Sequence, residues 1–111
     1  MAQDDRLRKS GLSFEQEERE RQLAMGIVRT MHLNTLRIAR AKLVDFLASN
    51  PPEPAASIIQ LRGEIAHEEI RRREAGVGLF ERMRLSVFAD GEGQLAEFEV
   101  RRYTKIRGWN V

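Results

Sequence analysis

The chain has 111 residues, a formal net charge of +2 and no cysteine, with 41% hydrophobic and 32% charged residues. This length fits a single domain, and this composition is typical of a folded soluble protein rather than a membrane protein. The lack of cysteine excludes disulfides, thiolate catalysis and Cys-ligated metal sites. The polar N-terminus has no apolar core of a secretory signal, so we expect a cytoplasmic protein or one held within a macromolecular assembly.

The first expected element is one long helix over 13–49, which begins a single α+β domain at 13–111. Residues 1–12 before it lack apolar periodicity and predict a flexible polar arm. Ser13 and Gln16 have the spacing of a capping box, which marks the helix start. The proline turn 50–54 ends the helix, because each proline disfavours helical geometry in the residue before it.

The length of this helix bears on assembly. About 36 helical residues at about 1.5 Å each would span roughly 54 Å, whereas a compact domain of this size has a radius of gyration of about 13 Å. The helix must project from the domain, pair with another chain, or break. Gly26 is the one candidate break, since a helical glycine costs about 1 kcal/mol relative to alanine.

The second half of this helix is apolar in two sectors, so it needs cover on two sides. Arginines lie among the apolar residues, and arginine is favoured over lysine at protein interfaces. We therefore predict a protein interface on this helix. Its residues are Val28, Arg29, Met31, Leu36, Arg37, Arg40, Leu43 and Leu47.

A second helix is expected over 55–75, where Ser57 and Gln60 repeat the capping-box spacing. It can form an antiparallel helical hairpin with the first helix through the proline turn. Beyond this helix, the spacing of the apolar residues changes. Alternation of apolar and charged side chains predicts a β-hairpin over 85–103 around the Asp90-Gly91 turn, and hence the α+β fold class.

Glu64 and His67 are the one weak metal candidate, because Glu-x-x-His spacing places a carboxylate and an imidazole on one helical face, as in di-iron bundles. The ligands expected from a facing helix are missing, which favours a solvated charged face. No serine lies in a Gly-x-Ser-x-Gly context, and no glycine-rich phosphate loop is present. We therefore expect no enzyme, no cofactor and no small-molecule substrate.

The basic tail 101–111 combines positive charge with the only tyrosine and the only tryptophan. Basic residues can neutralise phosphates while aromatic rings stack on bases. The interpretation we favour is a final strand whose two rings cover the core or a subunit contact. The candidate nucleic-acid residues are Arg101, Arg102, Tyr103, Lys105, Arg107 and Trp109.

These patterns favour a non-enzymatic structural or adaptor subunit, which oligomerises or docks into a larger protein assembly through its long two-faced helix. A component of a virion or of a secretion-type complex would fit. The alternative is a small nucleic-acid-binding regulator that uses the basic aromatic tail and the arginines of the long helix.

Overall fold

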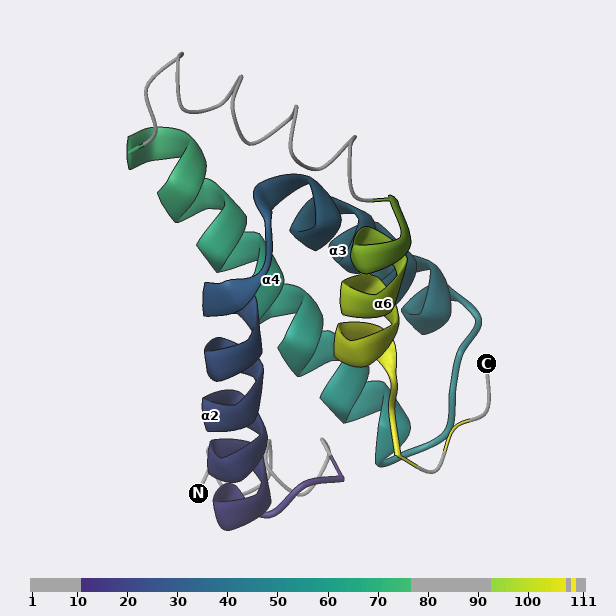
Figure 1. Cartoon of the computed structure of the whole chain (residues 1–111). Helices are drawn as coiled ribbons and strands as arrows, with labels where there is room; N and C mark the ends of the chain where they lie inside the picture. Colours follow the sequence, from purple (N-terminus) through teal and green to yellow (C-terminus); the bar gives the residue numbers. More distant parts are fainter. Residues whose placement is uncertain (1–10, 77–92, 108, 110–111) are drawn as a thin grey trace.

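The computed structural model describes residues 11–76, 93–107 and 109, and this part of the chain holds four helices and no strand (Figure 1). The helices are α2 (Phe14–Thr30), α3 (Leu33–Ala48), α4 (Ala55–Gly76) and α6 (Gly93–Thr104). The described fold is therefore all-helical, and the predicted α+β class is wrong. The predicted polar arm lies outside the described residues except for its last two positions.

Helix α2 begins where the sequence predicts. The Ser13 hydroxyl accepts a hydrogen bond from the Gln16 backbone N–H at 3.1 Å, and the Gln16 side chain accepts one from the Ser13 N–H at 3.0 Å. Each side chain thus satisfies a donor at the helix start. The helix then continues through Gly26, around which a Cβ atom would meet nothing within 4 Å. Gly26 therefore does not break the helix.

The long predicted helix breaks instead at Met31 and His32, whose backbones are extended (φ −85°, ψ 144° and φ −68°, ψ 150°). The expectation of one helix over 13–49 is wrong for this reason. His32 is the N-cap residue of α3 without a side-chain capping bond, and the Thr35 hydroxyl donates to the His32 carbonyl at 2.7 Å. The break turns α3 back across the other helices rather than letting it project.

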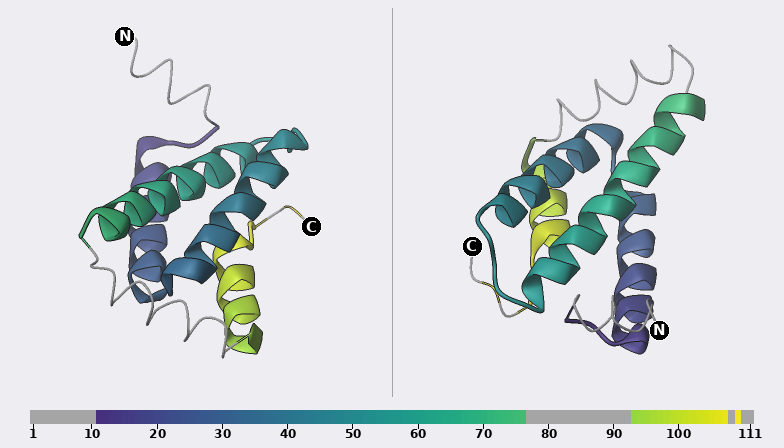
Figure 2. Two further views of the ribbon diagram at one scale, coloured as in Figure 1. Left: turned by 90° about the horizontal axis from the view of Figure 1, so that it is seen from above. Right: turned by 180° about the vertical axis from the view of Figure 1, so that it is seen from behind.

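Helix α3 packs between two other helices. It lies antiparallel to α4 across the turn 50–54 and packs against α6 on another side, whereas α2 packs mainly on α4 (Figures 1 and 2). Helix α4 begins at Ala55, where the sequence places the second helix. A helical hairpin is therefore present, but its first arm is α3 alone.

The predicted β-hairpin over 85–103 is wrong where the structure describes it. Residues 85–92 lie outside the described part, and 93–104 form α6. The apparent alternation placed Phe98 and Val100 on one face, yet Phe98 is 63% exposed and Val100 is 4% exposed. Val100, Tyr103 and Thr104 are all buried, which is the i, i+3, i+4 spacing of a helix face.

The core is a single apolar cluster to which all four helices contribute. Its largest fully buried side chains include Tyr103, Leu36, Leu43 and Ile59. Trp109 packs edge-on against Phe46 at the margin of this cluster, with ring centroids 5.1 Å apart. Among the described helices, none has the length and apolar character that crossing a membrane requires.

Candidate functional site

The predicted interface residues separate into two groups. The apolar group of Val28, Met31, Leu36 and Leu43 is at most 4% exposed and belongs to the core of this chain. Helices of the same chain cover these side chains, so they do not offer a surface to a partner in this fold. The remaining members are Arg29, Arg37, Arg40 and Leu47.

An exposed stripe runs along the outer side of α3, and we call Arg37, Arg40, Val44 and Leu47 the α3 stripe. Their spacing of three, four and three residues places them on one helical face. Val44 is 53% exposed and Leu47 39% exposed. Val44 is the member that the sequence-based list omitted, although its helical spacing from Leu47 could have indicated it.

Arg37 has a fixed position within this stripe. Its guanidinium donates to the Glu74 carboxylate of α4 at 2.6 Å and to the Asn34 side chain at 3.2 Å. Among the described residues, Arg40 has no ion pair, and its side chain is only partly buried. The stripe therefore presents two apolar side chains and one cation whose charge no described carboxylate neutralises.

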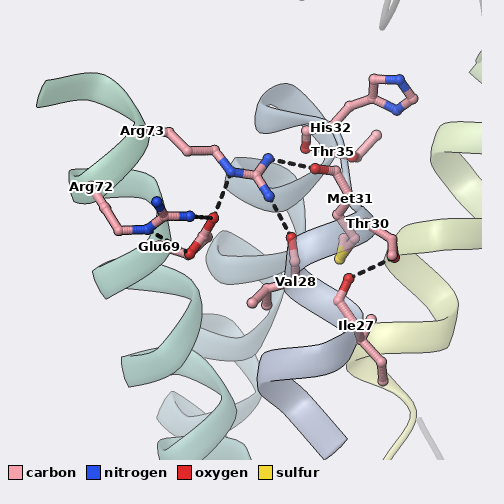
Figure 3. Close-up of polar contacts among 9 residues, drawn as sticks. All are labelled: Ile27, Val28, Thr30, Met31, His32, Thr35, Glu69, Arg72 and Arg73. Atoms are coloured by element: carbon pink, nitrogen blue, oxygen red, sulfur yellow. Dashed lines mark hydrogen bonds and ion pairs between the residues drawn. The ribbon is translucent and has the colours of Figure 1, made fainter. Parts of the chain in front are cut away.

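Arg73 of α4 caps the C-terminus of α2 (Figure 3). Its guanidinium donates to the Val28 and Met31 carbonyls and to the Glu69 carboxylate at 2.7 Å. The last carbonyls of a helix lack the donors that a further turn would supply. The Val28 carbonyl also accepts from the Met31 N–H at 3.3 Å, and Arg73 adds a donor to both carbonyls. The contact explains why the chain can leave helical geometry at Met31, a feature that no local sequence signal marks.

Glu69 has two arginine partners, because Arg72 also donates to it at 2.6 Å. Burial of the Glu69 side chain, which is 11% exposed, favours the neutral carboxyl. The hydrogen bonds and positive charges of Arg72 and Arg73 outweigh this effect and lower the Glu69 pKa below its ordinary value of 4.5.

Arg62 of α4 makes a second buried network. Its guanidinium pairs with Glu20 of α2 and donates to the carbonyls of Tyr103 and Lys105 at the end of α6. The Tyr103 hydroxyl in turn donates to the Arg62 carbonyl at 2.7 Å. Burial raises the Tyr103 pKa above its ordinary value. The positive charge of Arg62 lowers this pKa and the negative charge of Glu20 raises it, both by smaller amounts. Arg62 thus joins three helices and has a structural role.

Glu99 of α6 lies at the start of α3. Its carboxylate is 3.0 Å from the Thr35 hydroxyl and 3.7 Å from Nδ1 of His32. A carboxylate at a helix N-terminus is favoured by the helix dipole. This contact fixes α6 against the break between α2 and α3, where His32 is partly buried.

The weak metal candidates Glu64 and His67 are both exposed on α4. Glu64 accepts a hydrogen bond from Gln60 at 3.4 Å. Within the described ranges, no three His, Asp or Glu side chains gather closely enough to hold a metal ion. The arrangement there is a solvated helix face, which was the alternative interpretation of the Glu-x-x-His spacing.

The candidate nucleic-acid residues do not form one surface. Tyr103 is fully buried and Trp109 is partly buried against Phe46, so Tyr103 cannot stack on a base in this fold. Four basic side chains of this segment remain exposed, and one of them, Arg101, pairs with Glu97 at 3.3 Å. The other three are Arg102, Lys105 and Arg107.

Two open grooves of about 690 Å³ each flank α2. The first lies between α2 and α4, and charged side chains of both signs line it: Arg21, Arg29, Glu64, Glu68, Glu69 and Arg72. The second lies between α2, the proline turn and the C-terminal segment. Its walls include Leu23, Pro52, Pro54 and Ile58, with Arg19 and Arg107.

Comparison of the chain with protein-family models, with curated proteins and with solved structures found no match. Functional inference therefore depends on the surfaces described above.

Proposed function

We propose that this chain is a non-enzymatic adaptor or assembly subunit that binds a helix of another chain through the α3 stripe. The observation that carries this proposal is the exposure of Val44 and Leu47 on one helical face beside Arg40. Apolar side chains with interspersed arginine are typical of the centre of protein interfaces. A few well-buried side chains commonly provide most of the binding energy of an interface.

The chemistry of the stripe also indicates the character of the partner. Helix α3 carries Arg37, Arg40 and Lys42 against a single carboxylate, Asp45. Two copies of α3 placed face to face would bring like charges together, which costs energy at an interface. An amphipathic helix with carboxylates beside its apolar face is therefore the favoured occupant.

The proposal is tested by comparing the full chain with two variants of equal charge change. Val44→Asp places a carboxylate in the stripe, whereas Phe14→Asp places one on α2 at a side chain that is 67% exposed. Circular dichroism should show the same helix content for all three proteins. Sedimentation velocity across micromolar concentrations reports self-association, and affinity capture from the source cells reports a different partner.

We expect a captured protein that Phe14→Asp retains and Val44→Asp loses. The loss should be at least tenfold in affinity, about 1.4 kcal/mol, because a charge buried without a partner is strongly unfavourable. A self-associated species that Val44→Asp loses would instead contradict the choice of an acidic partner helix. A wild-type chain that stays monomeric and captures nothing sensitive to Val44→Asp would reject the adaptor function.

The second candidate is nucleic-acid binding through phosphate contacts alone. It is supported by the exposed Arg102, Lys105 and Arg107, for which the described residues provide no ion pair. Such binding should weaken steeply with salt. The slope of the logarithm of the binding constant against the logarithm of salt concentration should become more negative by roughly one unit for each phosphate neutralised. Failure to bind DNA or RNA at low salt would eliminate this candidate.

A further inference from the structure

The groove beside the proline turn has an apolar lining assembled from two segments. Leu23 of α2, which is 52% exposed, and Ile58 near the start of α4 both line the groove. Pro52 and Pro54 form the rim between them and are both exposed. The groove volume of about 690 Å³ lies within the range of about 300–1,000 Å³ that is usual for small-molecule sites.

The carboxylates in this lining already have partners inside the protein. Glu20 pairs with Arg62, which lies behind the groove. Glu53 accepts a hydrogen bond from the Ser57 hydroxyl at 2.5 Å. The charge of Glu20 is therefore compensated by Arg62, whereas Glu53 is held in position by Ser57 and keeps its negative charge.

The two arginines of the lining differ from these carboxylates. Arg19 and Arg107 are exposed, and neither makes an ion pair with a described residue. The lining itself holds two arginines and two glutamates. Because Glu20 is already paired with the buried Arg62, Arg19 and Arg107 have only Glu53 as an opposing charge in the lining. The first groove has the same volume and is lined by three arginines and three glutamates.

We propose that the groove beside the proline turn binds a small soluble amphiphilic monoanion, of the class of a medium-chain carboxylate. Its hydrocarbon part would lie against Leu23, Ile58 and the two prolines. Its carboxylate would accept hydrogen bonds from Arg19 and Arg107, since the planar guanidinium matches a carboxylate in geometry and charge. This site is separate from the α3 stripe and does not depend on the adaptor function.

Titration of the full chain with decanoate tests the proposal, using calorimetry and amide chemical shifts of isotope-labelled protein. Decanol has the same hydrocarbon chain without the charge. We expect decanoate to bind at least about tenfold more tightly than decanol. The largest shifts should fall on residues 19–23 and 52–58, and the melting temperature should rise with decanoate concentration.

The arginine variants distinguish binding of the carboxylate head group from binding of the hydrocarbon part of the ligand. Arg19→Gln combined with Arg107→Gln should weaken decanoate binding about 10- to 100-fold and leave decanol binding unchanged. Arg29→Gln in the first groove is the matched control and should change neither. Because Arg19 and Arg107 are exposed, their substitution should leave helix content and unfolding unaltered. Val44→Asp should also leave decanoate binding unchanged, which keeps this test independent of the adaptor proposal.

Three results would overturn the proposal. The first is equal affinity for decanoate and decanol, which would reduce the site to a nonspecific apolar surface. The second is decanoate binding that the double arginine variant retains. The third is flotation of the wild-type chain, but not of the double variant, with vesicles of anionic phospholipid in the absence of decanoate binding, which would assign the arginines to a membrane surface.

Discussion

Replacing Arg62 with leucine should destabilise the protein more than any other single change to a polar residue described above. The Arg62 side chain is 8% exposed and makes three hydrogen bonds, to Glu20 and to the carbonyls of Tyr103 and Lys105. The leucine variant leaves the Glu20 carboxylate, itself 16% exposed, without its cation. It also leaves two carbonyls at the end of α6 without their donor.

The magnitude follows from these losses. Breaking a buried ion pair by removing one partner costs about 3–5 kcal/mol, because the remaining charge is buried and unpaired. We expect Arg62→Leu to lower the free energy of unfolding by about 4 kcal/mol, a large part of the roughly 5–15 kcal/mol typical of a domain. Arg62→Lys should recover little, since an ammonium cannot reproduce the three directed bonds of the guanidinium.

A double-mutant cycle with Glu20→Leu checks the reasoning. Removing both charges avoids the unpaired carboxylate, so Glu20→Leu with Arg62→Leu should be more stable than Arg62→Leu alone by about 1–2 kcal/mol. Urea unfolding followed by circular dichroism and by Trp109 fluorescence gives the free energies. A cost below about 1 kcal/mol for Arg62→Leu, or strictly additive effects at the two sites, would refute the account.

Further predictions concern pH and backbone conformation. Glu69→Gln should destabilise the protein by about 2 kcal/mol at neutral pH. Because the folded-state pKa of Glu69 is lowered, its stabilisation is complete above the unfolded pKa near 4.5 and is lost as pH falls through the folded value, so the two proteins should converge in acid urea titrations. Gly26→Ala should raise the free energy of unfolding by about 0.5–1 kcal/mol, since this helical position has open space, and a decrease would show that it is not helical. Gly11→Ala should instead lower the melting temperature, because Gly11 has φ +75° and an added Cβ would clash with Glu53.

The sequence predicted those helix ends that are set by residues close to them in the chain. The capping box at Ser13 and Gln16 starts α2, and the turn 50–54 separates α3 from α4. Both depend on contacts within a few residues. The break at Met31 differs, because Arg73, which caps the end of α2, is 42 residues further along the chain. A long-range contact of this kind leaves no mark in the sequence around the break.

The β-hairpin prediction for the C-terminal segment was wrong for another reason. Over six residues, Leu95 to Val100, alternation and helical spacing overlap, and nearby glycines resemble a hairpin turn. The buried positions Val100, Tyr103 and Ile106 show the longer period only when the segment is extended past the predicted strand. The sequence left open whether Tyr103 belongs to a binding tail or covers the core, because its burial depends on packing against Arg62 of α4.

Apolar periodicity also cannot tell whether cover comes from the same chain or from another. The sequence indicated that the long helix needs neighbours on two sides, and α3 does have them in α4 and α6. The break at Met31 makes this possible, since it returns α3 to the other helices instead of extending it. The surface left for a partner is therefore smaller than the predicted interface and centres on Val44 and Leu47. An interface this small binds tightly only if its few anchors are fully buried by the partner, which is why a single carboxylate at Val44 should weaken binding at least tenfold.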